Sequence, residues 1–169
     1  MINGDYQKFI NFSFSTGGSR FRSKEIVEKY MSKDLNKIGL SIIEKSSKAI
    51  IASVDDDGFP NLKAMLKPRE NDELKVFYFT TNTSSMRVKQ YMENPKSSIY
   101  FYDNRFFRGI MLKGNMEVLQ DQATKERIWR DGDNIYYPNG VTDPDYSVLK
   151  FTTKTCRIYE NFKSYDFEA

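Results

Sequence analysis

The sequence has 169 residues, of which 39% are hydrophobic and 15% aromatic, so it is long enough for one globular domain with its own core. Its net charge is +3, from 26 Lys and Arg against 23 Asp and Glu, and the basic residues are scattered; nucleic acid is therefore not an expected partner. The chain has no histidine and one cysteine, which excludes the common zinc sites, Ser-His-Asp triads and Cys-His pairs.

The N-terminal sequence, Met1-Ile2-Asn3-Gly4-Asp5, lacks the basic and apolar regions of a secretion signal. No apolar run is long enough to span a bilayer. The single Cys156 cannot form an intrachain disulfide, which fits a reducing compartment. We therefore expect a cytoplasmic protein with no membrane partner and no metal site.

The first part of the chain shows no clear periodicity. We expect residues 1–22 to form an N-terminal arm and residues 23–169 to form a single domain. Two helices are predicted at the start of this domain, one with Ser23 as its N-cap and one from Asp34, in which Gly39 weakens the helix. Both have apolar residues at helical spacing, namely Ile26, Val27, Tyr30, Met31, Leu35, Ile38, Ile42 and Ile43.

After these helices the pattern changes to short strands separated by turn residues. Ala49 to Val54 is a predicted apolar strand, Asp55-Asp56-Asp57-Gly58 a turn, and Asn61 to Lys67 a second strand, so a hairpin is expected. Asn71-Asp72-Glu73 then predicts a turn into a third strand over residues 75–80.

The third strand leads into a helix that is predicted to begin at Ser84-Ser85 and to end before Pro95. The first turn of a helix has unpaired N–H groups and the positive end of the helix dipole, and Arg87 and Lys89 add positive charge here. This junction is a candidate site for the phosphate of a small molecule. The alternative is that the hydroxyls are ordinary N-caps and that the two cations form a solvated face.

Two more strands are predicted at Ser97 to Tyr102 and at Arg108 to Leu119. The second alternates strictly between apolar and polar positions, which predicts a half-buried strand that Gly114 bends. Asp121 is expected to cap a helix that extends to about Arg130.

A polar loop then leads to two predicted final strands, Val148 to Thr153 and Cys156 to Asn161. Cys156 is expected to be a small buried hydrophobe and not a nucleophile. Asp143 and Asp145 are expected to bond the backbone of a turn and not to act as a catalytic pair. About seven antiparallel strands joined by local hairpins predict a mainly β (α+β) fold, a small antiparallel barrel with flanking helices.

Several short segments occur in a characteristic order between about Leu35 and Tyr159: Gly58-Phe59-Pro60, Lys63-Ala64-Met65-Leu66, Phe77-Tyr78-Phe79-Thr80-Thr81-Asn82, Ser85-Met86-Arg87, Asn94-Pro95, Gly114-Asn115-Met116-Glu117-Val118 and Asp143-Pro144-Asp145-Tyr146. No segment is specific alone. The ordered set resembles the flavin-binding split β-barrels related to pyridoxamine 5′-phosphate oxidase, particularly the small branch of general stress proteins.

The resemblance implies an antiparallel split β-barrel that binds FMN, with Ser85 and Arg87 at the phosphate-contacting positions and Met86 between them. Lys63 stands where many relatives have an arginine that reaches the phosphate. The isoalloxazine ring would lie against two strands, and the full set of implied cofactor-binding residues is Lys63, Ala64, Met65, Leu66, Thr80, Thr81, Ser85, Met86 and Arg87. The alternatives are a solvated strand residue for Lys63 and a core or rim side chain for Met65.

The resemblance also implies a homodimer with the flavin cleft between its subunits. The aromatic residues Tyr100, Phe101, Tyr102, Phe106 and Phe107 are candidates for this interface, although core packing explains many of them equally well. Trp129 is expected to be a core or pocket-wall residue.

Three departures from the family pattern affect the expected function. Gly109 stands where the oxidase has a glutamine that contacts the flavin, a basic pair is reduced to Met86-Arg87, and Lys63 lacks the bidentate fork of an arginine. The oxidase also uses arginine and histidine residues near its C-terminus for its pyridoxal substrate, and this chain has no histidine. We therefore do not expect oxidation of vitamin B6, and the weakened phosphate contacts allow loose FMN binding, another flavin or a deazaflavin.

The favoured function is an FMN-dependent oxidoreductase acting on an unidentified small molecule, in which the flavin supplies the redox chemistry. No residue can be assigned as catalytic from the sequence. The main alternative is a non-enzymatic flavin carrier, sensor or stress-response module on the same barrel. A haem or tetrapyrrole binder is disfavoured, because the usual histidine ligand is absent.

Overall fold

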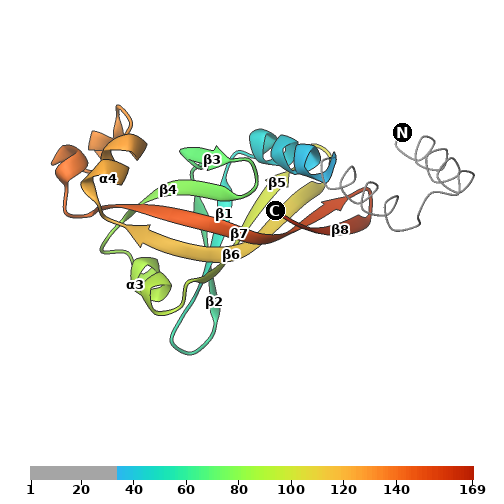
Figure 1. The fold of residues 1–169 in the computed structure, drawn as a ribbon, viewed down its shortest axis with the longest axis horizontal. Helices are drawn as coiled ribbons and strands as arrows, with labels where there is room; N and C mark the ends of the chain where they lie inside the picture. Colours follow the sequence, from blue (N-terminus) through green and yellow to red (C-terminus); the bar gives the residue numbers. More distant parts are fainter. Residues whose placement is uncertain (1–33) are drawn as a thin grey trace, which may run out of the picture. The chain divides into compact units, whose positions relative to one another are not determined.

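The computed structural model describes residues 34–169 (Figure 1). The predicted arm of residues 1–22 and the predicted helix from Ser23 lie outside the described residues. Within residues 34–169, an eight-stranded antiparallel sheet carries three α-helices, and none of these helices is long and apolar enough to cross a membrane. The described part of the chain is therefore mainly β with flanking helices, as predicted.

Residues 34–45 form the first helix of the described chain. The elements that follow are β1 (Ala49–Val54), β2 (Pro60–Met65), β3 (Glu70–Asp72), β4 (Val76–Asn82), α3 (Met86–Glu93), β5 (Lys96–Asp103), β6 (Arg108–Leu119), α4 (Gln122–Ile128), two 3₁₀ turns η1 (Asp133–Ile135) and η2 (Gly140–Thr142), β7 (Tyr146–Glu160) and β8 (Lys163–Glu168).

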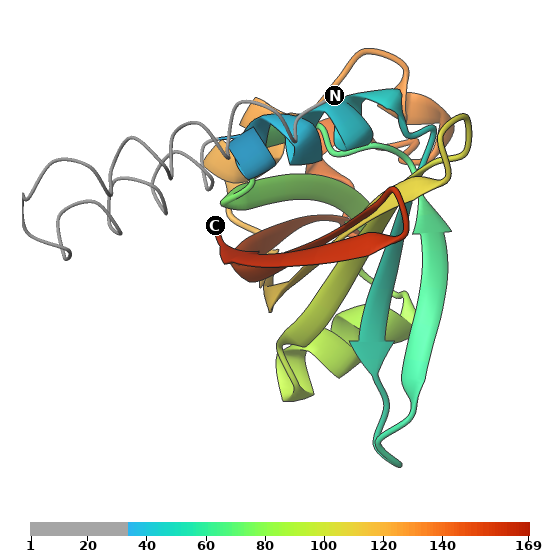
Figure 2. The same cartoon turned by 90° about the vertical axis from the view of Figure 1, so that its right-hand side faces the viewer.

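The strand order is β2-β1-β5-β6-β7-β4-β3, and β8 pairs with β7 beside this path. All of these pairs are antiparallel. Figure 2 shows that the sheet curls, so that β1 and β2 run in a different direction from β4 and β7. The strand order is an open path in which β2 and β4 are not hydrogen-bonded to each other. The sheet is therefore a barrel that does not close, which confirms the split-barrel prediction.

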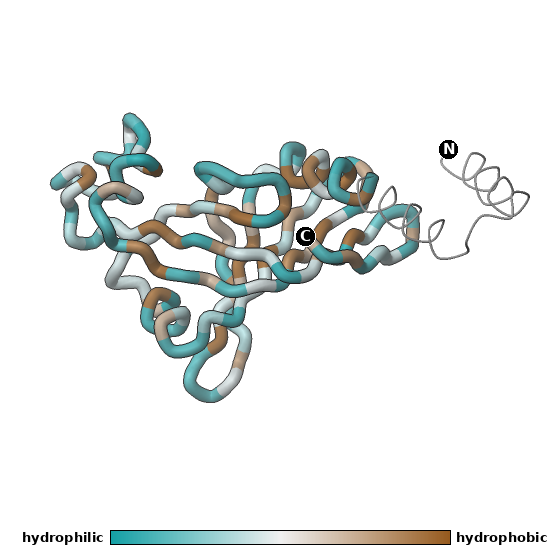
Figure 3. Tube along the Cα trace, in the orientation of Figure 1, coloured by the Kyte–Doolittle hydropathy of each residue, from teal (hydrophilic) through white to brown (hydrophobic). Residues whose placement is uncertain are grey.

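The main core lies inside the curled sheet and under the helix of residues 34–45. Ile42 and Ile43 of that helix are buried, as their helical spacing predicted. Phe77 packs against Phe101 and Phe151 with ring centroids 6.0 and 6.5 Å apart. Apolar residues accordingly follow the strands in Figure 3, whereas the hairpin ends are mostly hydrophilic. Burial of these side chains is the main stabilising contribution to the barrel.

Gly39 has a packing role that the sequence did not indicate. It is buried in the helix of residues 34–45, and a Cβ at this position would lie 2.8 Å from Cδ1 of Ile110 and 2.9 Å from Cδ1 of Leu74. The low helix propensity of glycine is thus offset by a close approach of this helix to the sheet.

A smaller apolar cluster lies between α4 and the start of β7. It consists of Ile128, Tyr137, Tyr146 and Val148. Trp129 packs on its edge, with its ring centroid 5.1 Å from that of Tyr146, in agreement with the predicted structural role of this tryptophan. This cluster fixes the loop that carries Tyr137.

The two predicted final strands are wrong, because the structure has one strand, β7, in their place. Thr155 pairs with Lys113 and Thr153 pairs with Gly114, so Lys154 is an extra residue on β7. Such a β-bulge interrupts the alternation of buried and exposed positions along a strand. This interruption led to the prediction of two separate strands.

Two short edge strands were not predicted. β3 (Glu70–Asp72) was expected to be part of a turn, and β8 (Lys163–Glu168) was expected to lie beyond the last strand. β3 is polar, and its residues are exposed or half-buried, so it lacks the apolar alternation that identifies a strand. β8 has only two apolar positions, Tyr165 and Phe167, which pack against the main core while the residues around them are polar. Their neighbours β4 and β7 supply the hydrogen bonds that define them.

Other local predictions are confirmed. β6 spans Arg108–Leu119 as expected, and the carboxylate of Asp121 caps α4 by accepting a hydrogen bond of 2.9 Å from the Thr124 amide. Cys156 is 1% exposed, and burial raises the pKa of its thiol to about 12. This thiol is therefore an unreactive core group at neutral pH.

Gly114 permits the close approach of β6 to β7 at the bulge. A Cβ at this position would overlap the carbonyl oxygen of Thr152. We expect Gly114→Ala to lower the free energy of unfolding by about 1–3 kcal/mol, the usual cost of overpacking a core. Lys113→Ala, at the exposed neighbouring position, should change it by less than about 0.5 kcal/mol. Urea denaturation measures both, and equal midpoints for the two variants would contradict this account.

Candidate functional site

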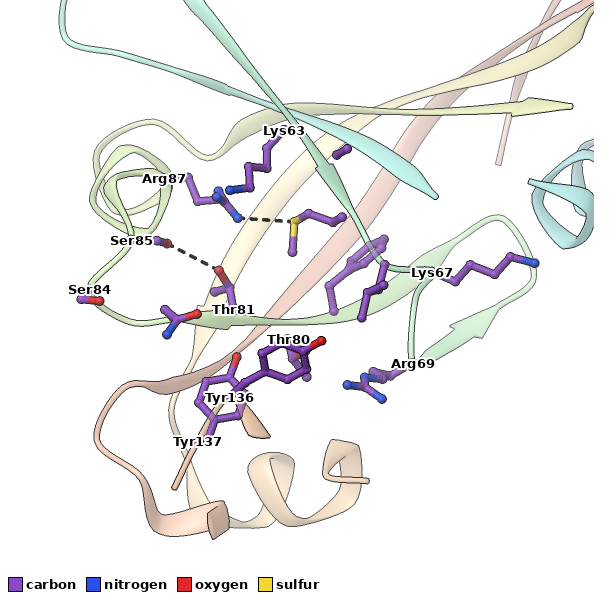
Figure 4. A pocket seen from close by; sticks show the side chains of 15 residues that line it. Lys63, Lys67, Arg69, Thr80, Thr81, Ser84, Ser85, Arg87, Tyr136 and Tyr137 are labelled. Atoms are coloured by element: carbon purple, nitrogen blue, oxygen red, sulfur yellow. Dashed lines mark hydrogen bonds between the residues drawn. The ribbon is translucent and has the colours of Figure 1, made fainter. Parts of the chain in front are cut away.

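A pocket of about 400 Å³ lies between β2 and β4, where the sheet does not close. Its other walls are the start of α3 and the loop that carries Tyr136 and Tyr137 (Figure 4). The lining residues are Lys63, Ala64, Met65, Leu66, Lys67, Arg69, Phe79, Thr80, Thr81, Asn82, Ser84, Ser85, Arg87, Tyr136 and Tyr137. This volume is within the range of small-molecule sites, about 300–1,000 Å³.

The β2 wall is an edge strand, since β2 pairs only with β1. One row of its backbone N–H and C=O groups therefore has no strand partner. A planar ligand with donors and acceptors along one edge would find complementary groups here. Ala64, Met65 and Leu66 contribute to this wall, and Lys63 begins it.

The predicted strand–helix junction forms the second wall and is confirmed in detail. β4 ends at Asn82, and α3 begins at Met86 with Ser85 as its N-cap residue. The Ser85 side chain makes no capping hydrogen bond; its hydroxyl lies 3.4 Å from the hydroxyl of Thr81. Both hydroxyls therefore lie together at the start of α3, and the unpaired N–H groups and the positive dipole end of a helix start suit an anion.

Two cations lie at this end of the pocket without a carboxylate partner. Within residues 34–169, neither Lys63 nor Arg87 forms an ion pair, and Figure 4 shows their charged ends close together. The contact that holds the Arg87 guanidinium is with the sulfur of Met65, 3.6 Å away. Both positive charges therefore remain available for an anionic ligand.

Lys89 does not belong to this site, although the sequence grouped it with Arg87. Its ammonium group pairs with Asp56 at 3.4 Å and with Glu93 at 3.6 Å, and its side chain is 67% exposed. Lys89 thus lies on the solvated face that the alternative interpretation proposed, and Lys63 from the neighbouring hairpin is the second cation at the α3 end of the pocket.

Asp145 holds the loop that precedes α3. Its carboxylate accepts hydrogen bonds from the Asn82 side chain at 2.6 Å and from the Ser84 amide at 2.7 Å. Its backbone carbonyl accepts a third from the Thr83 amide at 2.8 Å. The first two bonds hold the pKa of this carboxyl below its usual value. Asp145 is therefore a structural residue, as predicted, but the structure that it maintains is the anion-facing loop.

The opposite end of the pocket is formed by Arg69 and two tyrosines. Arg69 pairs with the buried carboxylate of Asp133, and this pair fixes η1 beside the pocket. Tyr137 is buried next to Thr80, and burial raises the pKa of its phenol to about 12. Tyr136 is 61% exposed. The Tyr137 phenol is therefore uncharged at neutral pH.

The sequence located most of the lining residues. All of the predicted cofactor-binding residues line the pocket except Met86, whose side chain is 65% exposed; any contact from Met86 would come through its backbone. The sequence missed Lys67, Arg69, Phe79, Asn82, Ser84, Tyr136 and Tyr137. Asn82 and Ser84 adjoin predicted residues, but the two tyrosines lie about fifty residues beyond Arg87 in the chain, and no local pattern places them here.

Gly109 does not line the pocket. It is buried on β6, paired with Tyr102 on one side and Tyr159 on the other. A Cβ at this position would overlap the phenol oxygen of Tyr100. The aromatic ring of Tyr100 therefore fills the space that a side chain at position 109 would take.

A family model described as pyridoxamine 5′-phosphate oxidase matches residues 40–160 of the chain. A Clostridium acetobutylicum protein related to general stress protein 26 of B. subtilis (pyridoxine phosphate oxidase family) has a crystal structure that superposes with a TM-score of 0.74, with 38% sequence identity over 80% of this chain and 94% of that one. General stress protein 26 from Bacillus anthracis shares the fold, with a TM-score of 0.64, 17% identity and coverage of 79% and 98%.

Among curated proteins, the pyridoxine/pyridoxamine 5′-phosphate oxidase of Wolbachia pipientis is 28% identical over 81 residues, which is 48% of this chain and 37% of that protein. The chain thus spans well under half the length of the curated relatives that it matches.

Asp145→Asn tests the role of the carboxylate at the pocket loop. The pKa of Asp145 is lower in the folded state than in the unfolded state, where it is about 3.9. The charged carboxylate therefore stabilises the fold above this pH, and the stabilisation is lost as the pH falls through the pKa of the folded state. We expect the variant to be less stable than the wild type at pH 7, and the difference to shrink below about pH 4. Urea midpoints across this pH range measure the effect.

Asp57→Asn removes an exposed carboxylate from the β1–β2 turn and is the matched control. A pH-independent difference between Asp145→Asn and the wild type would mean that the lost interaction is not that of the charged carboxylate.

Proposed function

The chain belongs to the pyridoxamine 5′-phosphate oxidase family, and from this membership we propose that the pocket between β2 and β4 binds FMN. The observation that carries the proposal is the pair of uncommitted cations, Lys63 and Arg87, beside the Ser85 hydroxyl at the start of α3. A phosphate group suits this arrangement, because charge-assisted hydrogen bonds and the helix dipole both favour a dianion there.

The remaining walls suit an isoalloxazine ring. The unpaired edge of β2 offers alternating backbone donors and acceptors to the polar edge of such a ring, and Met65 and Leu66 offer apolar surface. Thr80 and Thr81 line the facing strand, and the phenol of Tyr137 next to Thr80 stays protonated. Lys63 supplies charge without a bidentate fork, so another flavin or a deazaflavin is the alternative ligand.

When bound, the flavin would supply electron or hydride transfer to a small-molecule substrate. The residues of the chain bind and orient: Arg87 and Lys63 neutralise the phosphate, and the Arg69–Asp133 pair holds the tyrosine loop over the opposite end. The lining residues include no carboxylate and no histidine, so the candidate proton donors are the phenols of Tyr136 and Tyr137 and the ammonium group of Lys67. The vitamin B6 activity of the curated relatives is not proposed for this chain.

We also propose a homodimer with the flavin cleft at the subunit interface. Relatives in the family are often dimeric, and β2 carries exposed apolar side chains, with Leu62 71% and Leu66 55% exposed. Exposed apolar surface next to a ligand pocket is typical of an interaction site.

The single reduced cysteine fits a cytoplasmic location.

The first test is the visible absorption spectrum of the purified protein, with mass spectrometry of any released ligand and titration with FMN. We expect bound or tightly titrating FMN. Ser85→Ala with Arg87→Ala removes the hydroxyl and one cation from the phosphate, which should weaken FMN binding about 10- to 100-fold or more. Flavin fluorescence measures the dissociation constants.

Lys89→Ala is the matched control, since it removes a cation from the same helix but outside the pocket. An equal loss of FMN affinity in this control would show that the effect is one of general charge, and no flavin binding by the wild type would remove the proposed function.

A second measurement separates an enzyme from a carrier. If the protein is an oxidoreductase, a nicotinamide cofactor should reduce the bound flavin, and an organic acceptor should reoxidise it with multiple turnovers. A flavin that stays oxidised under these conditions, while binding tightly, would favour the non-enzymatic carrier or sensor.

A further inference from the structure

Two neighbouring hairpin turns carry exposed phenylalanine side chains. The β5–β6 turn carries Phe106 and Phe107, which are 66% and 82% exposed, and the β7–β8 turn carries Phe162, which is fully exposed. The two turns lie at the same end of the sheet, because the start of β6 pairs with the end of β7, and Figure 2 shows them, in yellow and red, next to each other. We call Phe106, Phe107 and Phe162 the phenylalanine tip.

The backbone of these turns does not favour phenylalanine. Phe107 and Phe162 have positive φ angles of 50° and 60°, a left-handed conformation that glycine and asparagine adopt at lower cost than a bulky residue. Neither side chain is buried in the core, so apolar burial within the protomer does not offset this strain. Large apolar side chains at these positions therefore point to a contact outside the protomer.

Ion pairs join the bases of the two turns. The guanidinium carbon of Arg108 lies 5.4 Å from the centre of the Phe106 ring. The same guanidinium pairs with Asp103 at 3.2 Å and with Glu160 at 3.0 Å. Because Asp103 belongs to β5 and Glu160 to β7, Arg108 holds both turns on a common support.

The exposed charges at this end are mainly positive. The two turns and the first residue of β8 contain two cations, Arg105 and Lys163, and no acidic residue. The carboxylates next to the turns are Asp103, whose side chain is buried and pairs with Arg105 and Arg108, and Glu160, which is mostly buried and pairs with Arg108. Electrostatics at the phenylalanine tip therefore favour an anionic partner.

Tyrosine side chains lie next to the phenylalanine tip on the strands. Tyr102 and Tyr159 flank Gly109 in the strand register, and both are partly exposed. The ring of Tyr102 meets that of Phe107 edge-on, with centroids 6.0 Å apart. Tyrosine and arginine, which have an apolar body and a polar end, suit the headgroup level of a membrane, whereas purely apolar side chains lie deeper.

The phenylalanine tip therefore has the layered order of a membrane interface, with apolar side chains at the turns and tyrosine and arginine behind them. A pocket in a partner protein imposes no such order, so a lipid surface is the favoured occupant. We propose that the phenylalanine tip inserts into the interfacial region of a membrane that contains anionic lipids and holds the protein at its surface.

This inference is independent of the flavin proposal. None of the three phenylalanines lines the pocket between β2 and β4, so the two surfaces are separate. The sequence predicted no membrane partner because no segment can span a bilayer, but binding at the surface through two turns requires no such segment.

Co-sedimentation of the full chain with lipid vesicles tests the proposal. Vesicles of equal parts phosphatidylcholine and phosphatidylglycerol should bind the wild type. Vesicles of phosphatidylcholine alone should bind it at least about tenfold more weakly, because the cations of the tip then have no anionic headgroup to meet. Added salt should weaken binding to the anionic vesicles.

The variant that tests the tip combines Phe106→Ser, Phe107→Asn and Phe162→Asn. It should bind the anionic vesicles at least about tenfold more weakly than the wild type, because the inserted apolar area is lost. Asparagine suits the left-handed backbone at the last two positions, so the urea midpoint should stay close to that of the wild type. Phe162→Asn alone should weaken vesicle binding in the same direction.

Phe59→Ser is the matched control. It removes a phenylalanine that is 69% exposed from the β1–β2 turn, where Asp55, Asp56 and Asp57 precede it. Vesicle binding by this variant should equal that of the wild type, because an acidic turn does not approach an anionic surface.

Several results would overturn the proposal: no binding of the wild type to either kind of vesicle, equal binding to both kinds, equal binding by the wild type and the folded triple variant, or an equal loss in Phe59→Ser. Light scattering without lipid tests the other occupant. A wild-type oligomer larger than that of the triple variant would assign the phenylalanine tip to an interface between copies of this chain and would overturn the lipid assignment.

Discussion

The pairing of β6 with β7 is the constraint on which the rest of the structure depends. β7 is shared along its length: Tyr146–Thr152 pairs with β4, and Thr155–Glu160 pairs with β8. The bulge at Lys154, opposite Gly114, lies between these two parts, and bulges bend and twist a strand. Because β4 is attached to the first part of β7, the curl of the sheet brings it across to face β2. The pocket exists because these two strands face each other without pairing.

Acidic and basic side chains have different places at the pocket: the carboxylate of Asp145 lies outside its lining, and the basic side chains of Lys63 and Arg87 belong to the lining. Asp145, just before β7, does not line the pocket, and its carboxylate holds the Asn82–Ser84 loop by hydrogen bonds. Lys63 and Arg87 do line the pocket, and neither has a carboxylate partner among the described residues. An anion entering this site therefore meets positive charge and free helix N–H groups that are already in position, so little reorganisation is needed on binding. The same separation explains why Lys89, paired with Asp56 and Glu93, contributes nothing to the pocket.

β2 is an edge strand with mostly exposed residues, and the proposed function gives a use to each of its free surfaces. Its unpaired backbone edge faces the pocket, and the apolar side chains of Leu62 and Leu66, on β2 and just after it, are exposed. An edge strand with exposed apolar residues would promote aggregation if nothing covered it. A flavin against the edge and a second subunit against the exposed apolar side chains would cover both.

The resemblance of the sequence to the family pointed to just over half of the residues that line the pocket. Local signals by themselves determined the alternating strand Arg108–Leu119, the cap of α4 at Asp121 and the start of α3 at Ser85. Local signals suffice there because periodicity and capping depend on neighbours along the chain. Only the tertiary structure decided that Lys89 lies outside the site, that Asp145 supports the loop, that Tyr136 and Tyr137 close the far end, and that one bulged strand replaces two. Each of these depends on strand register and on contacts between residues far apart in the chain, which no local pattern specifies.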